Sequence, residues 1–190
     1  MNKFVALAAV AATTAIAAPA AAQGGPTGPV GAHVEAVLGV DHVRLELDDL
    51  GLGGHVGDEG ILYGLGAGFD FAATSRVSLG VDVEATDSTL KASDSTASIR
   101  ASRDLYAGGR VSLAVASRTN LYLKAGYSNA RFTGRDGNLR ASTTLDGLRL
   151  GGGVQGSLGG KAFVGLEYRY TNYQSDVTRH QGALLIGTRF

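Results

Sequence analysis

The stretch ILYGLGAGFDF, residues 61–71, alternates two kinds of residue along its length. The odd positions carry isoleucine, leucine, alanine and aromatic rings, whereas the even positions carry glycine and Asp70, with Leu62 as the exception. Side chains of a β-strand point alternately to opposite faces, so the stretch predicts a strand with one apolar face and one small or polar face.

The same alternation recurs from residue 31 onward. It predicts eight strands, at about residues 31–44, 61–71, 76–85, 99–115, 121–132, 144–158 and 162–173 and in a last segment that ends on Phe190. We therefore predict an all-β fold, an eight-stranded antiparallel β-barrel over residues 31–190.

The predicted connections differ in length in a regular way. Those after the second, fourth and sixth strands are tight, at residues 72–75, 116–120 and 159–161. Those after the first, third and fifth are long, at residues 45–59, 87–98 and 133–143, while the connection at 174–176 is short. Short turns alternating with long loops, on an even number of strands, are typical of bacterial outer-membrane barrels.

The chemistry of the two faces separates a membrane barrel from a soluble one, in which the apolar face lies inside. The polar face carries charges of both signs interspersed with glycine, which suits an enclosed lumen where buried charges pair. The charges expected inside are Glu35, Asp70, Asp82, Glu84, Arg110, Lys124, Arg149, Glu167, Arg169 and Arg189, together with Asp104 and Arg76. This pattern favours a transmembrane β-barrel.

Aromatic residues on the apolar face fall into two groups. Phe69, Phe71 and Phe190 lie next to the short turns, and Tyr63, Tyr127, Tyr168 and Tyr170 lie towards the long loops. Because such rings prefer the headgroup level on either side of a bilayer, we interpret the two groups as aromatic belts.

The first 30 residues predict export. Lys3 precedes an apolar segment at 4–17, and Ala20-Ala21-Ala22 gives an A-x-A cleavage site before Gln23. We expect a signal peptide at residues 1–22, a periplasmic tail at 23–30 and a mature protein in the bacterial outer membrane. The chain contains no cysteine, which excludes a lipid anchor at that site and any disulfide framework.

Several other motifs carry little chemistry. Lys plus Arg equals Asp plus Glu, and no basic run occurs, so nucleic acid is not an expected partner. The G-x-G-x-x-G at 151–156 precedes a strand instead of a phosphate-facing helix. The histidines His33, His42, His55 and His180 lack metal-ligand spacing, so no metal and no cofactor is expected. The acidic residues of 46–59 could bind Ca²⁺, but a solvated surface loop is the favoured interpretation.

Short motifs at residues 123–127 (LKAGY), 166–171 (LEYRYT) and 187–190 (GTRF) resemble those of small outer-membrane barrels of the porin family, of the opacity-protein and OmpA transmembrane-domain type. The resemblance implies that Phe190 belongs to the signal read by the barrel-assembly machinery. It also implies outer-membrane lipid and lipopolysaccharide as partners, host or surface ligands at the loops, and no common catalytic residues.

The sequence also bears on two other functions, that of a lipid A-modifying enzyme and that of a diffusion porin. Residues 127–130 (YSNA) are similar to part of the His-x-Ser-Asn motif of lipid A deacylases, but Gly126 stands where the histidine belongs, so Ser128 lacks an adjacent base. A small diffusion porin is the alternative, although open channels use about 16–18 strands. We therefore expect a non-enzymatic surface protein with a structural or adhesive role and at most a narrow pore.

Overall fold

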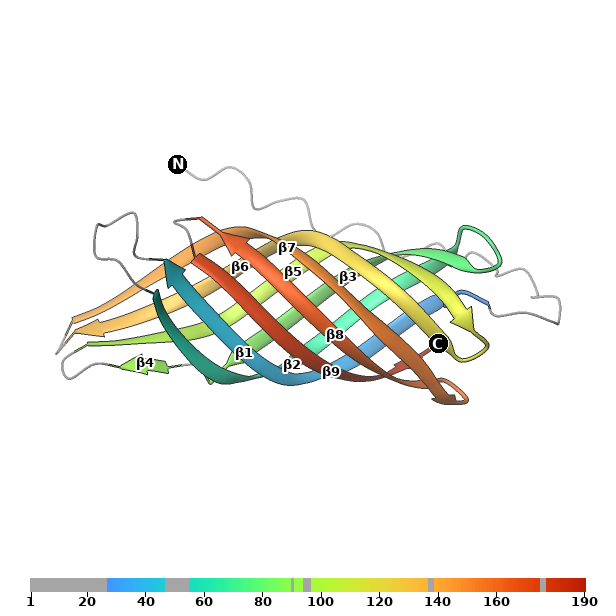
Figure 1. Ribbon diagram of the computed structural model, residues 1–190, viewed down its shortest axis with the longest axis horizontal. Coiled ribbons are helices and arrows are strands. Elements are labelled where there is room, and N and C mark those ends of the chain that lie inside the picture. Colours follow the sequence, from blue (N-terminus) through green and yellow to red (C-terminus); the bar gives the residue numbers. More distant parts are fainter. Residues whose placement is uncertain (1–26, 47–54, 90, 94–96, 137–138, 175–176) are drawn as a thin grey trace.

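The computed structural model describes residues 27–46, 55–89, 91–93, 97–136, 139–174 and 177–190, and within them it confirms the predicted barrel. Eight long strands form its wall (Figure 1). They are β1 (Gly31–Glu46), β2 (His55–Ala72), β3 (Val77–Ser88), β5 (Ala97–Ala116), β6 (Thr119–Asp136), β7 (Leu139–Gly159), β8 (Ala162–Tyr173) and β9 (Val177–Arg189). A ninth strand, β4 (Lys91–Ser93), pairs only with β5.

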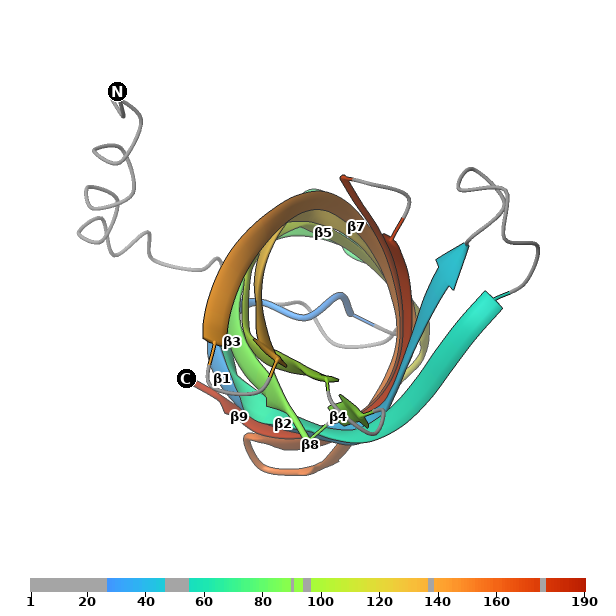
Figure 2. The same ribbon diagram turned by 90° about the vertical axis from the view of Figure 1, so that its left-hand side faces the viewer.

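The sheet closes on itself. Its strand order is β3-β2-β1-β9-β8-β7-β6-β5-β4, and a further pairing of β3 with β5 joins the two ends. All pairings are antiparallel, and the end-on view shows the resulting ring (Figure 2). Along the middle of the described barrel, each of the eight long strands is therefore paired on both sides, which is the condition for placing a β-sheet in hydrocarbon.

The two ends of the barrel differ. One end, here called the turn end, holds three tight connections at residues 73–76, 117–118 and 160–161, together with Gly31 and Phe190 (Figure 1). Gly159 and Gly160 have φ values of 110° and 57°, which favour glycine in the last of these turns. The opposite end, here called the loop end, holds the other connections. Figure 2 shows β1 and β2 leaving the ring at this end.

Strands at the loop end run further than the alternation predicted. The long connection expected at residues 133–143 is wrong, because β6 and β7 stay paired until Asp136 meets Leu139. This extension could not be predicted from the sequence, because its residues are polar at both odd and even positions. Alternation appears only where one face of a strand is buried, and it does not show which backbones pair. Arg76, which the sequence placed inside, lies exposed in the turn between β2 and β3.

Bulky inward side chains lie against inward glycines. The ring of Tyr106 covers Gly108 and Gly126, and Tyr122 covers Gly153, where a Cβ would lie 2.6 Å from the tyrosine hydroxyl oxygen. Each glycine therefore makes room for a ring inside a narrow lumen. The glycine-rich composition follows from this packing as well as from the turns.

Candidate functional site: the charged lumen

With one exception, the charges predicted for the lumen lie inside the barrel wall. Of the twelve, ten are only 0–4% exposed, Arg189, close to the turn end, has a side chain that is 17% exposed, and Arg76 lies in the exposed turn described above. Burial at this level requires that each charge meet opposite charges or hydrogen-bond partners. The described contacts form three clusters along the barrel axis.

The cluster nearest the loop end centres on Asp104. Arg179 donates from Nη1 to Asp104 Oδ2 over 3.0 Å and from Nε to Asp41 Oδ1 over 2.8 Å. Arg149 donates to the same Asp104 carboxylate, and Ser128 Oγ donates to Asp104 Oδ1 over 2.5 Å. Two arginines and two aspartates thus connect β1, β5, β7 and β9 across the lumen.

The middle cluster centres on Glu84 of β3, which faces three cations. Lys124 Nζ donates to its carboxylate, Arg169 Nη1 lies 2.9 Å from Oε2, and Arg149 Nη1 lies 3.6 Å from the same oxygen. Lys124 and Arg169 also contact Glu167. Arg149 belongs to both clusters, so the ionic contacts run without a break from the loop end to the middle of the barrel.

The third cluster lies towards the turn end. Arg189 donates from Nη1 to Asp70 Oδ2 over 2.6 Å, and Arg110 donates from Nε to Asp82 Oδ2 over 2.9 Å. His33 stands between the two aspartates, with Nδ1 3.4 Å from Asp70 and Nε2 3.3 Å from Asp82. His33 thus lies within ion-pair distance of two carboxylates from different strands.

An apolar layer adds to the obstruction. Val37, Leu62, Ala183 and Leu185 on the β1, β2 and β9 side cluster with Tyr122, which comes from β6 on the opposite wall. Tyr122 also donates from its hydroxyl to Glu167 Oε2 over 2.7 Å, which ties the layer to the middle cluster. Side chains therefore reach across the lumen from both walls.

Part of the lumen is suited to water. Among the described residues, Tyr106 Oη, Glu35 Oε2 and the Nη1 and Nη2 atoms of Arg110 are buried without a hydrogen-bond partner from the protein. Buried polar atoms of this kind are normally satisfied by ordered water. The lumen thus combines ionic clusters with buried polar atoms that the protein itself does not satisfy.

Three buried residues of these clusters, Asp41, Arg179 and His33, were missed by the sequence analysis. Asp41 lies six positions after Glu35 and Arg179 ten before Arg189, so each shares the face of a predicted interior charge. His33 and Asp41 share the face of Glu35 within the strand predicted at residues 31–44, so the alternation that places Glu35 and Arg189 inside also marks these three residues.

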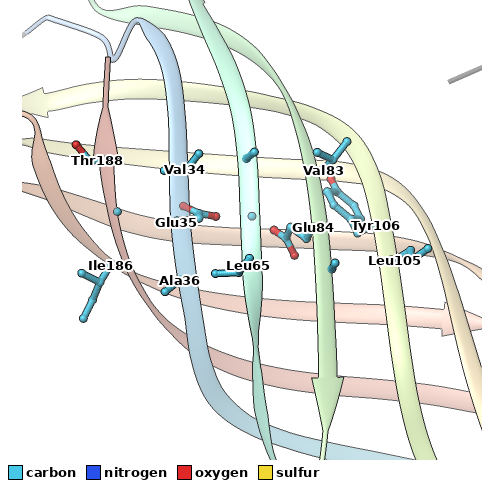
Figure 3. Close-up of a pocket in the computed structure, with 14 residues that line it drawn as sticks. Val34, Glu35, Ala36, Leu65, Val83, Glu84, Leu105, Tyr106, Ile186 and Thr188 are labelled. Atoms are coloured by element: carbon cyan, nitrogen blue, oxygen red, sulfur yellow. The ribbon is translucent and has the colours of Figure 1, made fainter. Parts of the chain in front are cut away.

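The outer surface is apolar. Of the predicted belt residues, Tyr63, Phe69, Phe71, Tyr127, Tyr168 and Phe190 are 43–68% exposed, and Tyr170 is partly exposed. A shallow groove of about 840 Å³ crosses β9, β1, β2, β3 and β5 on this surface (Figure 3). Its outward-facing walls are Val34, Leu65, Val83 and Ile186, and the small Ala36 lies between them.

Ser128, considered above as a nucleophile, points into the lumen and is fully buried. Its hydroxyl donates a hydrogen bond to Asp104 Oδ1, and Arg149 Nη2 donates to the hydroxyl oxygen over 3.0 Å. Within the described barrel, the side-chain hydrogen-bond partners of Ser128 are Asp104, Tyr173 and Arg149, and none is a histidine. Ser128 therefore serves as a hydrogen-bonding member of the loop-end cluster.

An apolar outside and a charged inside invert the arrangement of a soluble barrel, and with full closure they define an integral barrel of the outer-membrane class. In the described part of the chain, no helix is long and apolar enough to cross a membrane. The chain belongs to the family described as outer membrane protein beta-barrel domain, whose profile matches residues 8–190. This match confirms both the resemblance drawn from the sequence and the outer membrane as the location.

Solved structures agree on the fold. Ail, the attachment invasion locus protein of Yersinia pestis, superposes with a TM-score of 0.59 at 11% identity, covering 85% of this chain and 100% of that one. Neisserial surface protein A gives 0.62 at 17% identity, covering 84% and 97%. The outer membrane enzyme PagL gives 0.50 at 19% identity, covering 83% and 99%. No curated protein sequence matches the chain.

Proposed function

We propose that this protein is a non-enzymatic surface barrel that holds its loop end outside the cell and conducts through at most a narrow pore. The observation that carries the proposal is the lumen, in which ionic clusters and an apolar layer reach across the barrel from opposite walls. A wide water channel needs an open lumen, and eight strands enclose only enough space for side chains.

The outer surface supports a fixed orientation in the membrane. Phenylalanines near the turn end and tyrosines towards the loop end suit the headgroup levels of the two leaflets. We propose that the turn end faces the periplasm and that lipopolysaccharide surrounds the loop end. In this arrangement export by a signal peptide at residues 1–22, which lies outside the described residues, precedes assembly.

An adhesive role is the specific form of this proposal. The described strands that flank residues 47–54, 94–96 and 175–176 end at the loop end of a barrel held together by buried ionic contacts, and those residues themselves lie outside the described chain. Ail, a structural neighbour, is named an attachment invasion locus protein. We propose that host or surface ligands meet this chain at the same end.

The absence of catalysis is also proposed. It is supported by Ser128, whose hydroxyl is held by Asp104 and Arg149 within the lumen and not at the lipid-facing surface. Assaying the purified barrel for lipid A deacylation should give no product. A deacylase activity that disappears in Ser128→Ala would contradict this part of the proposal.

Orientation can be tested by single-cysteine labelling, because the chain has no cysteine of its own. Ser142 near the loop end and Ser75 at the turn end are both exposed, so they form a matched pair. In intact cells a membrane-impermeant thiol reagent should label Ser142→Cys and not Ser75→Cys, and both should react after permeabilisation. Labelling of Ser75→Cys alone in intact cells would contradict the proposed orientation.

A further inference from the structure

Two histidines that are far apart in the sequence meet on the outer surface near the loop end. His42 of β1 and His180 of β9 are direct partners in the strand register, and both side chains are partly exposed. Partners of this kind have Cβ atoms about 4.5–5.5 Å apart on the same face of the sheet. The register therefore creates a cross-strand pair of imidazoles that the sequence spacing concealed.

A side-chain oxygen atom of a neighbouring residue lies beside the Nδ1 atom of each imidazole. Tyr168 Oη lies 2.6 Å from His180 Nδ1, and Glu59 Oε1 lies 4.0 Å from His42 Nδ1. When Nδ1 carries the proton and faces such an oxygen, the lone pair of the ring lies on Nε2. Histidines that bind metals are commonly oriented in this way by a carboxylate or another acceptor.

The pair borders a surface pocket. This pocket has a volume of about 560 Å³ and is lined by residues that include His42, His180, Glu59, Tyr168 and Thr89. The ring of Tyr170 packs against His180 with centroids 5.1 Å apart, which restricts the imidazole from a further side. The pocket leaves space for water or another small ligand in front of the two imidazoles.

We propose that His42 and His180 together bind a divalent transition-metal ion of the Zn²⁺ or Cu²⁺ class through their Nε2 atoms. Metal–nitrogen bonds of about 2.0–2.1 Å place two such nitrogens about 3 Å apart, which imidazoles on opposed Cβ atoms can reach. Imidazole is the ligand type that suits these ions.

The site is a two-residue site. No group of three or more His, Cys, Asp or Glu side chains arranged to hold a metal occurs among the described residues, so water or an external ligand completes the coordination. Glu59 and Tyr168 act as orienting residues in this site. Because the pair lies on the outer wall, its metal binding is independent of the filled lumen.

The test uses the untagged barrel purified in detergent, titrated with Cu²⁺ at about pH 7.5 and followed by calorimetry and electron paramagnetic resonance. We expect one Cu²⁺ per barrel with nitrogen coordination, and loss of this site in His42→Gln/His180→Gln. Tyr168→Phe should weaken binding by about 10-fold while keeping the nitrogen signature, because it removes only an orienting contact.

The matched control is His55→Gln, at a β2 position four register pairs beyond the His42–Glu59 pair. It should leave the affinity unchanged. Lowering the pH to about 5.5 should weaken binding, since a metal competes with protons for imidazole nitrogen. Equal affinity of the wild type and the double variant, or tighter binding at the lower pH, would overturn the proposal.

Discussion

Arg179 shows how a single residue closes the lumen. Its side chain is fully buried, and it is held by carboxylates from two different strands, Asp41 of β1 and Asp104 of β5. Such pairs are costly to break, because removing one partner leaves a buried charge without compensation. Specific buried contacts of this kind distinguish a filled barrel from a hydrated tube.

Replacing Arg179 by Met should therefore destabilise the barrel. We expect a loss of about 3–5 kcal/mol in the free energy of unfolding, measured by urea titration in lipid vesicles. Asp41→Asn in the same chain should restore part of the loss by removing one of the uncompensated carboxylates. Arg76→Met, in an exposed turn, is the control and should change stability by less than about 0.5 kcal/mol. Equal stability of Arg179→Met and the wild type would show that the ionic cluster is not formed.

Gly153 supports a second prediction at this scale. A Cβ here would lie 2.6 Å from Tyr122 Oη and closer still to the carbonyl oxygen of Leu166, so Gly153→Ala should cost about 1–3 kcal/mol by overpacking. The control is Gly109→Ala on the outer face, where the nearest atom to a built Cβ is 3.8 Å away. Thermal unfolding, followed by heat-modifiable gel migration, should separate the two variants. Indistinguishable midpoints would contradict the proposed role of Gly153.

At the scale of elements, the strands were predictable where one face is apolar. Residues 61–71 alternate with Leu62 as the only exception and lie inside β2, whereas residues 133–143 are polar at both odd and even positions, a pattern that predicts a loop. Their pairing depends on continuation of the β6–β7 ladder, which leaves no hydrophobic signature. The pairing of His42 with His180 could not be predicted for another reason. It joins the first and last strands, and no local stretch of sequence shows which strands pair when the barrel closes.

The β6–β7 extension predicts protection in an unexpected place. Amides of residues 131–135 and 140–144 that bond across the ladder should exchange with deuterium more slowly than those of exposed turns, because exchange requires the ladder to open. Hydrogen–deuterium exchange with peptide resolution measures this directly. The turns at residues 117–118 and 160–161 are the internal reference. Exchange of the extension as fast as that reference would restore the loop predicted from the sequence.

Phe190 directly follows Arg189, the last residue of β9, and is 68% exposed. Its backbone N–H donates to Ala32 O over 2.9 Å, so deleting the residue removes one hydrogen bond and little packing, a cost of about 1 kcal/mol. If the assembly machinery reads this ring, the deletion should reduce surface abundance far more than it lowers stability after refolding. Phe190→Tyr, which keeps an aromatic ring, is the control. Unchanged surface abundance of the truncated chain would argue against the assembly role.

For the whole molecule, the fold class and the family are explained by one property: the charged side chains face the lumen and the apolar side chains face outward, the reverse of a soluble barrel. The large exposed side chains along the barrel wall are mostly apolar, while seven carboxylates and six Arg or Lys side chains of the described residues lie within, Arg189 being the most exposed of them. The sequence predicted this separation because alternate residues of a strand point to opposite faces. It did not predict which charges pair, because pairing depends on register and shear across the lumen.

The filled lumen is tested most directly by single-channel recording on the refolded barrel in planar bilayers. With the three clusters and the apolar layer in place, we predict no steady open channel and at most rare, small conductance events. Arg179→Met is the variant for comparison, because it removes the arginine that links Asp41 to Asp104. It should raise the frequency of such conductance events. A large and steady conductance from the wild-type barrel would contradict the account and favour a diffusion porin.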